Sequence, residues 1–190
     1  LVANVRLTHL VEVPGFRVAE VPQSNVIDKT VFAKLNRMRI APSEGCTDHE
    51  FIRRVYLDVI GVLPTADEVK AFMADTSKDR RSKVIESLVE RPEFYGFWTV
   101  KFADVLRANG RILQPKGATV FTRWIKSNLE RNRPMNEFVN DLLTAEGSAF
   151  QNPASNYYRV SKDPESSVET TAQLFLGVRI QCAKCHNHPF

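Results

Sequence analysis

From about residue 24 onward, apolar residues recur at the three- and four-residue spacing of amphipathic helices. Ile27, Val31, Leu35 and Met38 form the first such series, with Ser24 or Asn25 placed to cap its start and Ala41-Pro42 placed to end it. A second series ends at Gly61 and has an apolar face made of Phe51, Ile52, Val55, Tyr56, Val59 and Ile60. The pattern therefore predicts a helical body.

Capping signals divide this body into separate helices. Thr47 with Glu50 and Thr65 with Glu68 have the spacing of a capping box, in which a hydroxyl and a carboxylate satisfy each other's free backbone amides. Ser77 is predicted to open a further helix. We expect a helix to follow each of these three positions.

The most aromatic helix is predicted to begin at Pro92 and to stop at Asn109-Gly110. Further helices are predicted around Trp124, after Pro134 and after Pro164. Residues 148–164 read as a polar loop, in which Tyr157 and Tyr158 suggest that the chain folds back onto the body. Trp98 and Trp124 fall on apolar helix faces, so core packing is the favoured explanation for both.

Residues 1–23 have a different pattern from the rest of the chain. Their β-branched residues partly alternate and are broken by Pro14-Gly15, which predicts two short strands around a turn. The predicted fold is all-α, with a single domain of about eight helices over residues 24–190 and a short β-rich N-terminal segment over residues 1–23.

Composition and the absence of certain motifs argue against several classes of function. The formal charge is +4, and the 26 basic residues are interleaved with 22 acidic ones, so no basic stripe for nucleic acid stands out. No apolar run is long enough to predict a membrane span. Neither G-x-S-x-G, a phosphate-binding loop nor H-E-x-x-H occurs, so hydrolase and nucleotide-binding functions have no motif support.

Candidate chemistry gathers in the last ten residues. Cys182, Cys185 and His186 have the C-x-x-C-H spacing of a c-type haem attachment site, and His188 follows two positions later. On one helical turn the two sulfurs can reach the two vinyl groups of a porphyrin while the next residue offers its imidazole to the iron. The cofactor-binding residues predicted are therefore Cys182, Cys185 and His186.

Two alternatives remain open at this spacing. The two thiolates with His186 and His188 could supply four ligands to zinc, which prefers sulfur and nitrogen donors. Cys182 and Cys185 could also form a disulfide. The imidazole directly after the second cysteine favours haem over these alternatives. The histidines predicted as metal ligands are His186 and His188.

A sixth ligand to the iron would have to come from elsewhere in the chain. His49, Met38, Met73 and Met135 are the residue types available, but each lies in a helical pattern where a packing or surface role is favoured. His49 in particular is expected to face solvent in the first turn of its helix.

The chain resembles the planctomycete cytochrome-c-like domain family, an exported bacterial domain of unknown function that ends in a CxxCH-x-HPF block. The segments that carry the resemblance are residues 26–28, 34–35, 51–61, 63–65, 98, 101, 103–107, 132–134, 142–147, 156–158 and 175–190. The resemblance implies an exported, multidomain protein in which this domain often follows an Ig-like β domain, so residues 1–23 could be the tail of such a domain. It also implies that family members continue beyond Phe190 with a further aromatic-rich segment.

The functional expectation is a c-type haem-binding redox or electron-transfer module in the periplasm or outside the cell. The partners expected are other domains of the same exported protein and a redox partner protein, without nucleic acid. The alternative is a structural or interaction domain whose cysteines bind zinc or form a disulfide, with no redox role. Whether the protein is an enzyme is left open.

Overall fold

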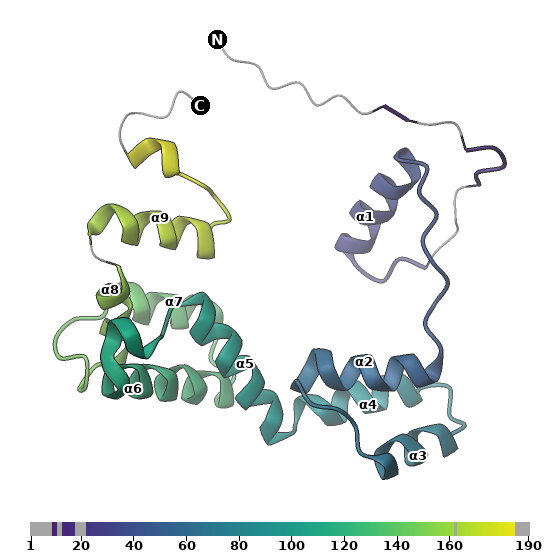
Figure 1. Ribbon diagram of the computed structural model, residues 1–190, viewed down its shortest axis with the longest axis horizontal. Coiled ribbons are helices and arrows are strands. Elements are labelled where there is room, and N and C mark those ends of the chain that lie inside the picture. The colour runs from purple at the N-terminus through teal and green to yellow at the C-terminus, as the bar shows by residue number, and fades with distance from the viewer. Residues whose placement is uncertain (1–8, 11–12, 18–21, 162, 185–190) are drawn as a thin grey trace. The chain divides into compact units, whose positions relative to one another are not determined.

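The computed structural model describes residues 9–10, 13–17, 22–161 and 163–184, and only the backbone of Cys182 and Lys184 (Figure 1). The chain divides after Thr47 into two compact units, residues 1–47 and 48–190. The predicted boundary after residue 23 stays a prediction.

The predicted strands of residues 1–23 lie largely on residues 1–8, 11–12 and 18–21, outside the described ones. The turn at Pro14-Gly15 is confirmed, because Phe16 N–H donates to Val13 O at 3.1 Å and Gly15 has a φ of 76°. Among the residues that the structure describes there is no strand, so the β-rich segment is not supported there.

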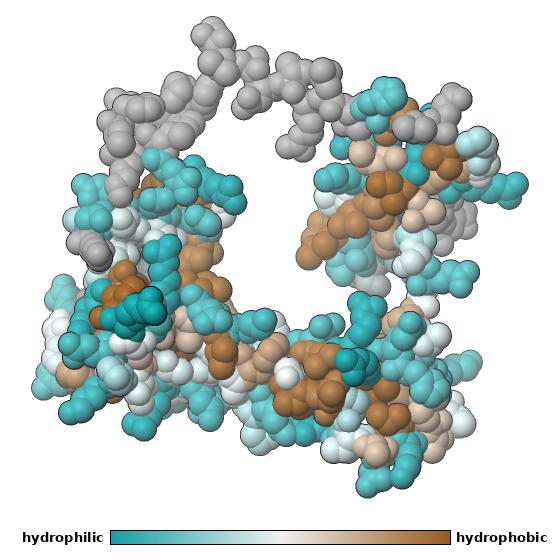
Figure 2. Space-filling model, viewed as in Figure 1, coloured by the Kyte–Doolittle hydropathy of each residue, from teal (hydrophilic) through white to brown (hydrophobic). Residues whose placement is uncertain are grey.

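Helix α1 (Val26–Arg37) is the helix of the first unit. Asn25 caps it, since its Oδ1 accepts from the N–H groups of Ile27 at 2.9 Å and Asp28 at 3.0 Å. No residue of α1 is buried, and Figure 2 shows hydrophobic residues on its surface. The first predicted helix therefore exists, with an apolar face that is exposed.

The second unit begins with three helices around one hydrophobic cluster. These are α2 (Asp48–Ile60), α3 (Ala66–Ala74) and α4 (Arg80–Val89). We call their buried residues the first cluster: Ile52, Val55, Tyr56, Ile60, Phe72 and Leu88. The predicted capping box of α3 is confirmed, because Thr65 N–H donates to Glu68 Oε2 at 2.7 Å and Glu68 N–H donates to Thr65 Oγ1 at 3.3 Å. The helix predicted from Ser77 begins at Arg80 instead, because Ser77 N–H is held in a turn by Asp75 Oδ1 at 2.8 Å.

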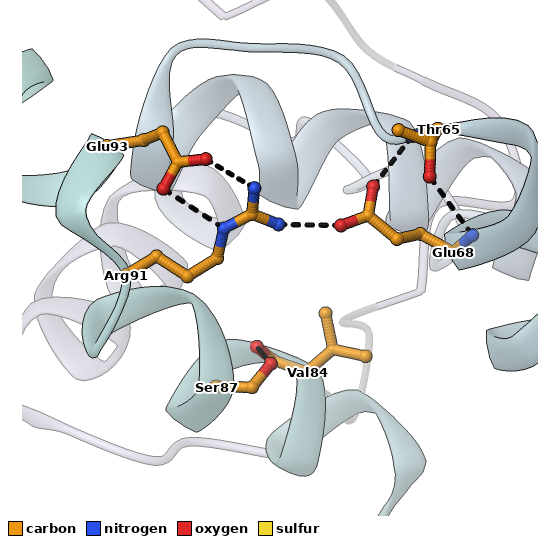
Figure 3. Close-up of polar contacts among 6 residues, drawn as sticks. All are labelled: Thr65, Glu68, Val84, Ser87, Arg91 and Glu93. Carbon is orange, nitrogen blue, oxygen red and sulfur yellow. Dashed lines mark hydrogen bonds and ion pairs between the residues drawn. The ribbon is translucent and has the colours of Figure 1, made fainter.

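An ion-pair network ties α3 to the start of helix α5 (Pro92–Val105), which follows α4 (Figure 3). Arg91 donates from Nη1 to Glu68 Oε1 at 2.6 Å and from Nη2 to Glu93 Oε1 at 2.5 Å. The pKa of Glu68 is lowered, first by the Thr65 backbone N–H and then by its side chain and Arg91. The pKa of Glu93 is lowered chiefly by its hydrogen bond from Arg91.

Helices α5 (Pro92–Val105), α6 (Gly110–Glu130), α7 (Met135–Leu143) and α8 (Asn156–Val160) surround a second set of buried residues. We call this set the second cluster: Leu106, Leu113, Phe121, Ile125, Phe138, Leu142, Ala145, Ala154, Tyr157 and Val160. Phe94 of α5 packs against the first cluster and Phe102 packs against the second, so α5 belongs to both.

Helix α6 departs from the prediction at both its start and its interior. Asn109-Gly110 was expected only to stop a helix, but Asn109 caps the next one by accepting from Ile112 N–H at 3.1 Å. Gln114 interrupts α6 with φ 59° and ψ 161°, just before Pro115. Proline cannot donate to the preceding turn, which explains why the kink lies there.

The predicted polar loop over residues 148–164 contains the 3₁₀ turn η1 (Pro153–Ser155) and helix α8. Asn156 is fully buried, and its Nδ2 donates to Ala149 O and to Pro153 O, both at 3.0 Å. Tyr157 is 2% exposed. The expectation that this segment folds back onto the body is confirmed, but its helical turns were missed.

The chain continues through α9 (Pro164–Phe175) to the 3₁₀ turn η2 (Gln181–Lys184). The all-α class is confirmed for the described part of the chain, which holds nine α-helices where about eight were expected. None of those helices combines the length and the apolar character that crossing a bilayer demands.

Candidate functional site

Helix α9 leads directly into the cysteine motif. Asp163 caps its start by accepting from Ser166 N–H at 2.7 Å, and Pro164 occupies its first turn. At its other end Gly177 adopts φ 67°, and Val178 N–H donates back to Ala172 O at 3.1 Å. The left-handed glycine turns the chain, and the hydrogen bond fixes the connection against the helix.

Cys182 lies in the 3₁₀ turn η2, where Ala183 N–H donates to Ile180 O at 2.9 Å. Cys185, His186 and His188 lie outside the described residues. The structure therefore places the start of the predicted site, and the assembly of its four side chains stays a prediction.

A shallow groove borders the turn that carries Cys182. It has a volume of about 240 Å³ and is lined by Pro164, Glu165, Val168, Glu169, Ile180 and Ala183. Two of its lining residues, Ile180 and Ala183, flank Cys182 in the sequence, and the other four belong to the first half of α9. The motif thus begins beside a surface with apolar residues and two carboxylates.

Tyr157 anchors α9 to the second cluster. Its hydroxyl lies 3.0 Å from Thr171 Oγ1, and its ring centre lies 6.5 Å from that of Phe175. Burial raises the pKa of Tyr157 because it disfavours the charged phenolate. The groove beside Cys182 therefore rests on a helix that is attached to a packed core.

The described residues fit part of what a c-type haem requires. Two thiols and an imidazole are the donors for covalent attachment and axial ligation. Pro164, Val168 and Ile180 offer an apolar surface next to the first thiol's position in the chain. Small-molecule sites usually exceed about 300 Å³, so this groove of about 240 Å³ can cover only one edge of a porphyrin.

The candidates for a sixth ligand have other surroundings. His49 is exposed in the first turn of α2, as expected. Met73 packs against the first cluster, and Met135 is 50% exposed. Within residues that the structure describes, no three His, Cys, Asp or Glu side chains come together as a metal site.

The structure also shows a hollow that we did not predict from the sequence. A cavity of about 320 Å³ is lined by Phe94, Trp98, Phe102, Asn128, Leu129, Asn132, Arg133, Met135 and Phe138. Trp98 is half-buried here and donates its indole N–H to Val59 O at 3.1 Å. Trp124 instead stacks between Phe121 and Phe138, which confirms core packing for that residue.

A sequence signal for this cavity did exist. Phe94, Trp98 and Phe102 stand at four-residue intervals, so they share one helix face, and Asn128 and Asn132 repeat that interval on α6 and just after it. Aromatic and amide residues at matching intervals on neighbouring helices are a pattern that a core rarely needs, because buried amides must find hydrogen-bond partners.

Comparison with protein families gives one match. The family model described as "PSCyt2: Protein of unknown function (DUF1549)" matches residues 26–190. Neither the curated proteins nor the solved structures contain a match to this chain.

Proposed function

The chain belongs to the PSCyt2 family of proteins of unknown function (DUF1549), and we propose that its Cys182, Cys185 and His186 attach a c-type haem. The helical body would then serve as a redox or electron-transfer module. The haem part of this proposal rests on the C-x-x-C-H spacing, and the export of the domain is what the family resemblance implies.

The observation that supports the proposal most is the 3₁₀ turn at Gln181–Lys184. In such a turn, residues i and i+3 lie above one another on the same side. Cys182 and Cys185 have that separation in the sequence. The turn ends at Lys184, before Cys185. The proposal therefore adds that the Cys185 thiol faces the same guest as the Cys182 thiol, and that the following imidazole points at its centre.

Each residue has a distinct role in the proposal. The thiols of Cys182 and Cys185 would hold the porphyrin covalently, and the His186 imidazole would bind its iron. The bound haem would supply a centre that accepts and releases one electron. Val168 and Ile180 would keep water from one edge of it. The proposed location is periplasmic or extracellular, and the proposed partners are a redox protein and other domains of the same exported protein.

A zinc site is the second candidate, and one observation favours it. Glu165 and Glu169 line the groove beside the turn that carries Cys182. Zinc accepts carboxylate oxygens as well as the sulfur and nitrogen donors of Cys182, Cys185, His186 and His188. In that case the domain would have a structural or interaction role without redox chemistry, as it would with a simple Cys182–Cys185 disulfide.

The decisive experiment is export of the full chain from a bacterial host that carries a cytochrome c maturation system. We expect a Soret absorption band and an intact mass equal to polypeptide plus one haem. The double variant Cys182→Ser/Cys185→Ser should lose the covalent haem, because it removes both thioether bonds. Cys46→Ser is the matched control and should retain the haem, since Cys46 lies outside the motif.

Three results would overturn the haem proposal. A bare polypeptide mass without a Soret band would exclude covalent haem. Stoichiometric zinc by elemental analysis, lost in His186→Ala and His188→Ala, would establish the second candidate instead. An intact mass two hydrogens below the reduced polypeptide, without zinc, would establish the disulfide.

A further inference from the structure

The aromatic cavity of α5, α6 and α7 has a rigid wall. Phe94, Trp98 and Phe102 lie on one face of α5 and line the cavity together. The indole of Trp98 is held by its hydrogen bond to Val59 O at 3.1 Å. The ring of Phe102 meets that of Phe138 edge to face, with centres 6.0 Å apart. A wall of fixed aromatic rings suits a flat apolar guest.

Polar groups line the same cavity. Asn128, Asn132 and Arg133 contribute to its lining, and Asn128 is only 7% exposed. Arg133 Nε is buried without a hydrogen-bond acceptor. Among the described residues it is the only buried side-chain nitrogen or oxygen that lacks a hydrogen-bond partner. A buried donor without an acceptor is costly, so it indicates a place where a ligand oxygen or a water belongs.

The charges around Arg133 restrict what this acceptor can be. Arg133 Nη2 lies 2.9 Å from Asp141 Oδ2, and Arg133 Nε lies 3.5 Å from Glu137 Oε2. The distance from Arg133 Nε to Glu137 Oε2 is short enough for an ion pair but too long for a good hydrogen bond. Two carboxylates already face one guanidinium, so a further anion would be repelled. A neutral oxygen acceptor is favoured over a carboxylate or phosphate.

We propose that this cavity binds a small, neutral, planar aromatic molecule whose carbonyl oxygen accepts a hydrogen bond from Arg133 Nε. The cavity's volume of about 320 Å³ lies at the lower end of known small-molecule sites, roughly 300 to 1,000 Å³. The aromatic wall binds the ring, and Arg133 selects the oxygen. This inference is independent of haem attachment, because none of its residues belongs to the cysteine motif.

The test compares three probes of similar size on the full chain: acetophenone, ethylbenzene and benzoate. Acetophenone carries the ring and the carbonyl, ethylbenzene lacks the oxygen, and benzoate adds a negative charge. Binding is followed by NMR of the methionine methyl groups. Met135, which is 50% exposed and lines the cavity, should shift, whereas Met38 and Met73 lie elsewhere and should not.

We expect acetophenone to bind roughly five-fold more tightly than ethylbenzene, the net effect of one hydrogen bond, and benzoate to bind most weakly. Arg133→Lys keeps the positive charge for Asp141 and Glu137 but removes Nε, so acetophenone should fall to the affinity of ethylbenzene. Arg131→Lys makes the same chemical change outside the cavity lining and should alter nothing. Met135→Trp should fill the cavity and abolish the binding of all three probes, which is followed on the probes' own NMR signals because this variant lacks the Met135 methyl group.

The proposal is overturned if the three probes bind equally, if none shifts Met135 up to its solubility limit, or if Met38 and Met73 shift as much as Met135. It is also overturned if Arg133→Lys, with unchanged Met38 and Met73 signals that show an intact fold, binds acetophenone as the unmodified chain does. Tightest binding by benzoate would show that the site accepts anions and would contradict the charge argument.

Discussion

The two hydrophobic clusters of the second unit are held by different kinds of polar contact. Around the first cluster the contacts are charged: Arg91 binds Glu68 and Glu93, and Asp48 binds Arg80 and Arg81. Beside the second cluster the central polar group is the buried amide of Asn156, which itself carries no charge. Charged contacts near the surface respond to pH and salt, whereas a buried amide does not titrate. The stability of the two regions should therefore depend on different conditions.

The largest loss of stability on the side of the first cluster is expected from a substitution at Gly61. It adopts φ 72°, and a Cβ added there would lie 2.7 Å from Phe97 Cε2, too close for real atoms. We expect Gly61→Ala to lower the free energy of unfolding by about 3 kcal/mol, from the left-handed backbone and the overlap together. Urea unfolding followed by circular dichroism measures the change.

Gly147, which follows α7, provides the control for Gly61. It also has a positive φ, 86°, but a Cβ there would meet nothing within 4 Å. Gly147→Ala should cost only the backbone strain, about 1 kcal/mol. Equal losses for the two alanine variants would show that the contact with Phe97 is not tight, and would contradict the expected packing of α5 against the end of α2.

Asn156 is the next largest target and lies between Ala154 and Tyr157 of the second cluster in the sequence. Asn156→Ala leaves Ala149 O and Pro153 O without their donor and Arg159 without its acceptor. We expect a loss of about 2 kcal/mol in the free energy of unfolding, independent of pH between 4 and 8, because Asn156 is fully buried and its amide does not titrate. Chemical unfolding at several pH values tests both points. The exposed Asn140→Ala serves as the control and should change little.

The ion-pair network gives the smallest effect and the opposite pH behaviour. Arg91→Met should lower the free energy of unfolding by about 1 kcal/mol at neutral pH, the upper range for partly exposed pairs. The pKa values of Glu68 and Glu93 are lowered in the folded protein. Their contribution is therefore present above the unfolded value of about 4.3 and is lost as the pH falls through the lower folded values.

The original chain and Arg91→Met should consequently converge in stability as the pH is lowered below about 4. Lys70→Met removes an exposed pair with Asp67 and is the matched control, with little change expected at any pH. A constant difference between the original chain and Arg91→Met down to low pH would mean that Arg91 acts through packing over the Tyr56 ring rather than through its charge.

Local signals in the sequence predicted much of the helical body. Thr65 and Glu68 identified the start of α3 because a capping box is a contact between residues three apart. The fold was less visible where distant partners decide it. Helix α8 forms inside a segment rich in turn residues because Asn156 and Tyr157 are buried and find hydrogen-bond partners there, which no local pattern reveals.

The candidate sites show the same limit. The spacing of Cys182, Cys185 and His186 was readable from the chain alone, because covalent attachment depends on neighbours in sequence. The aromatic cavity was not predicted, because the spacing of Phe94, Trp98 and Phe102 is also that of a filled core face. Whether a face is filled depends on the side chains opposite it, and these are brought there by the fold.

The sharing of α5 between the two clusters has a mechanical consequence. The helix has 14 residues, about the shortest length at which an isolated helix begins to hold itself in water. If one cluster unfolded, only part of α5 would still pack against the other cluster. The two clusters thus share one short helix, and the cooperativity of unfolding between them depends on that helix.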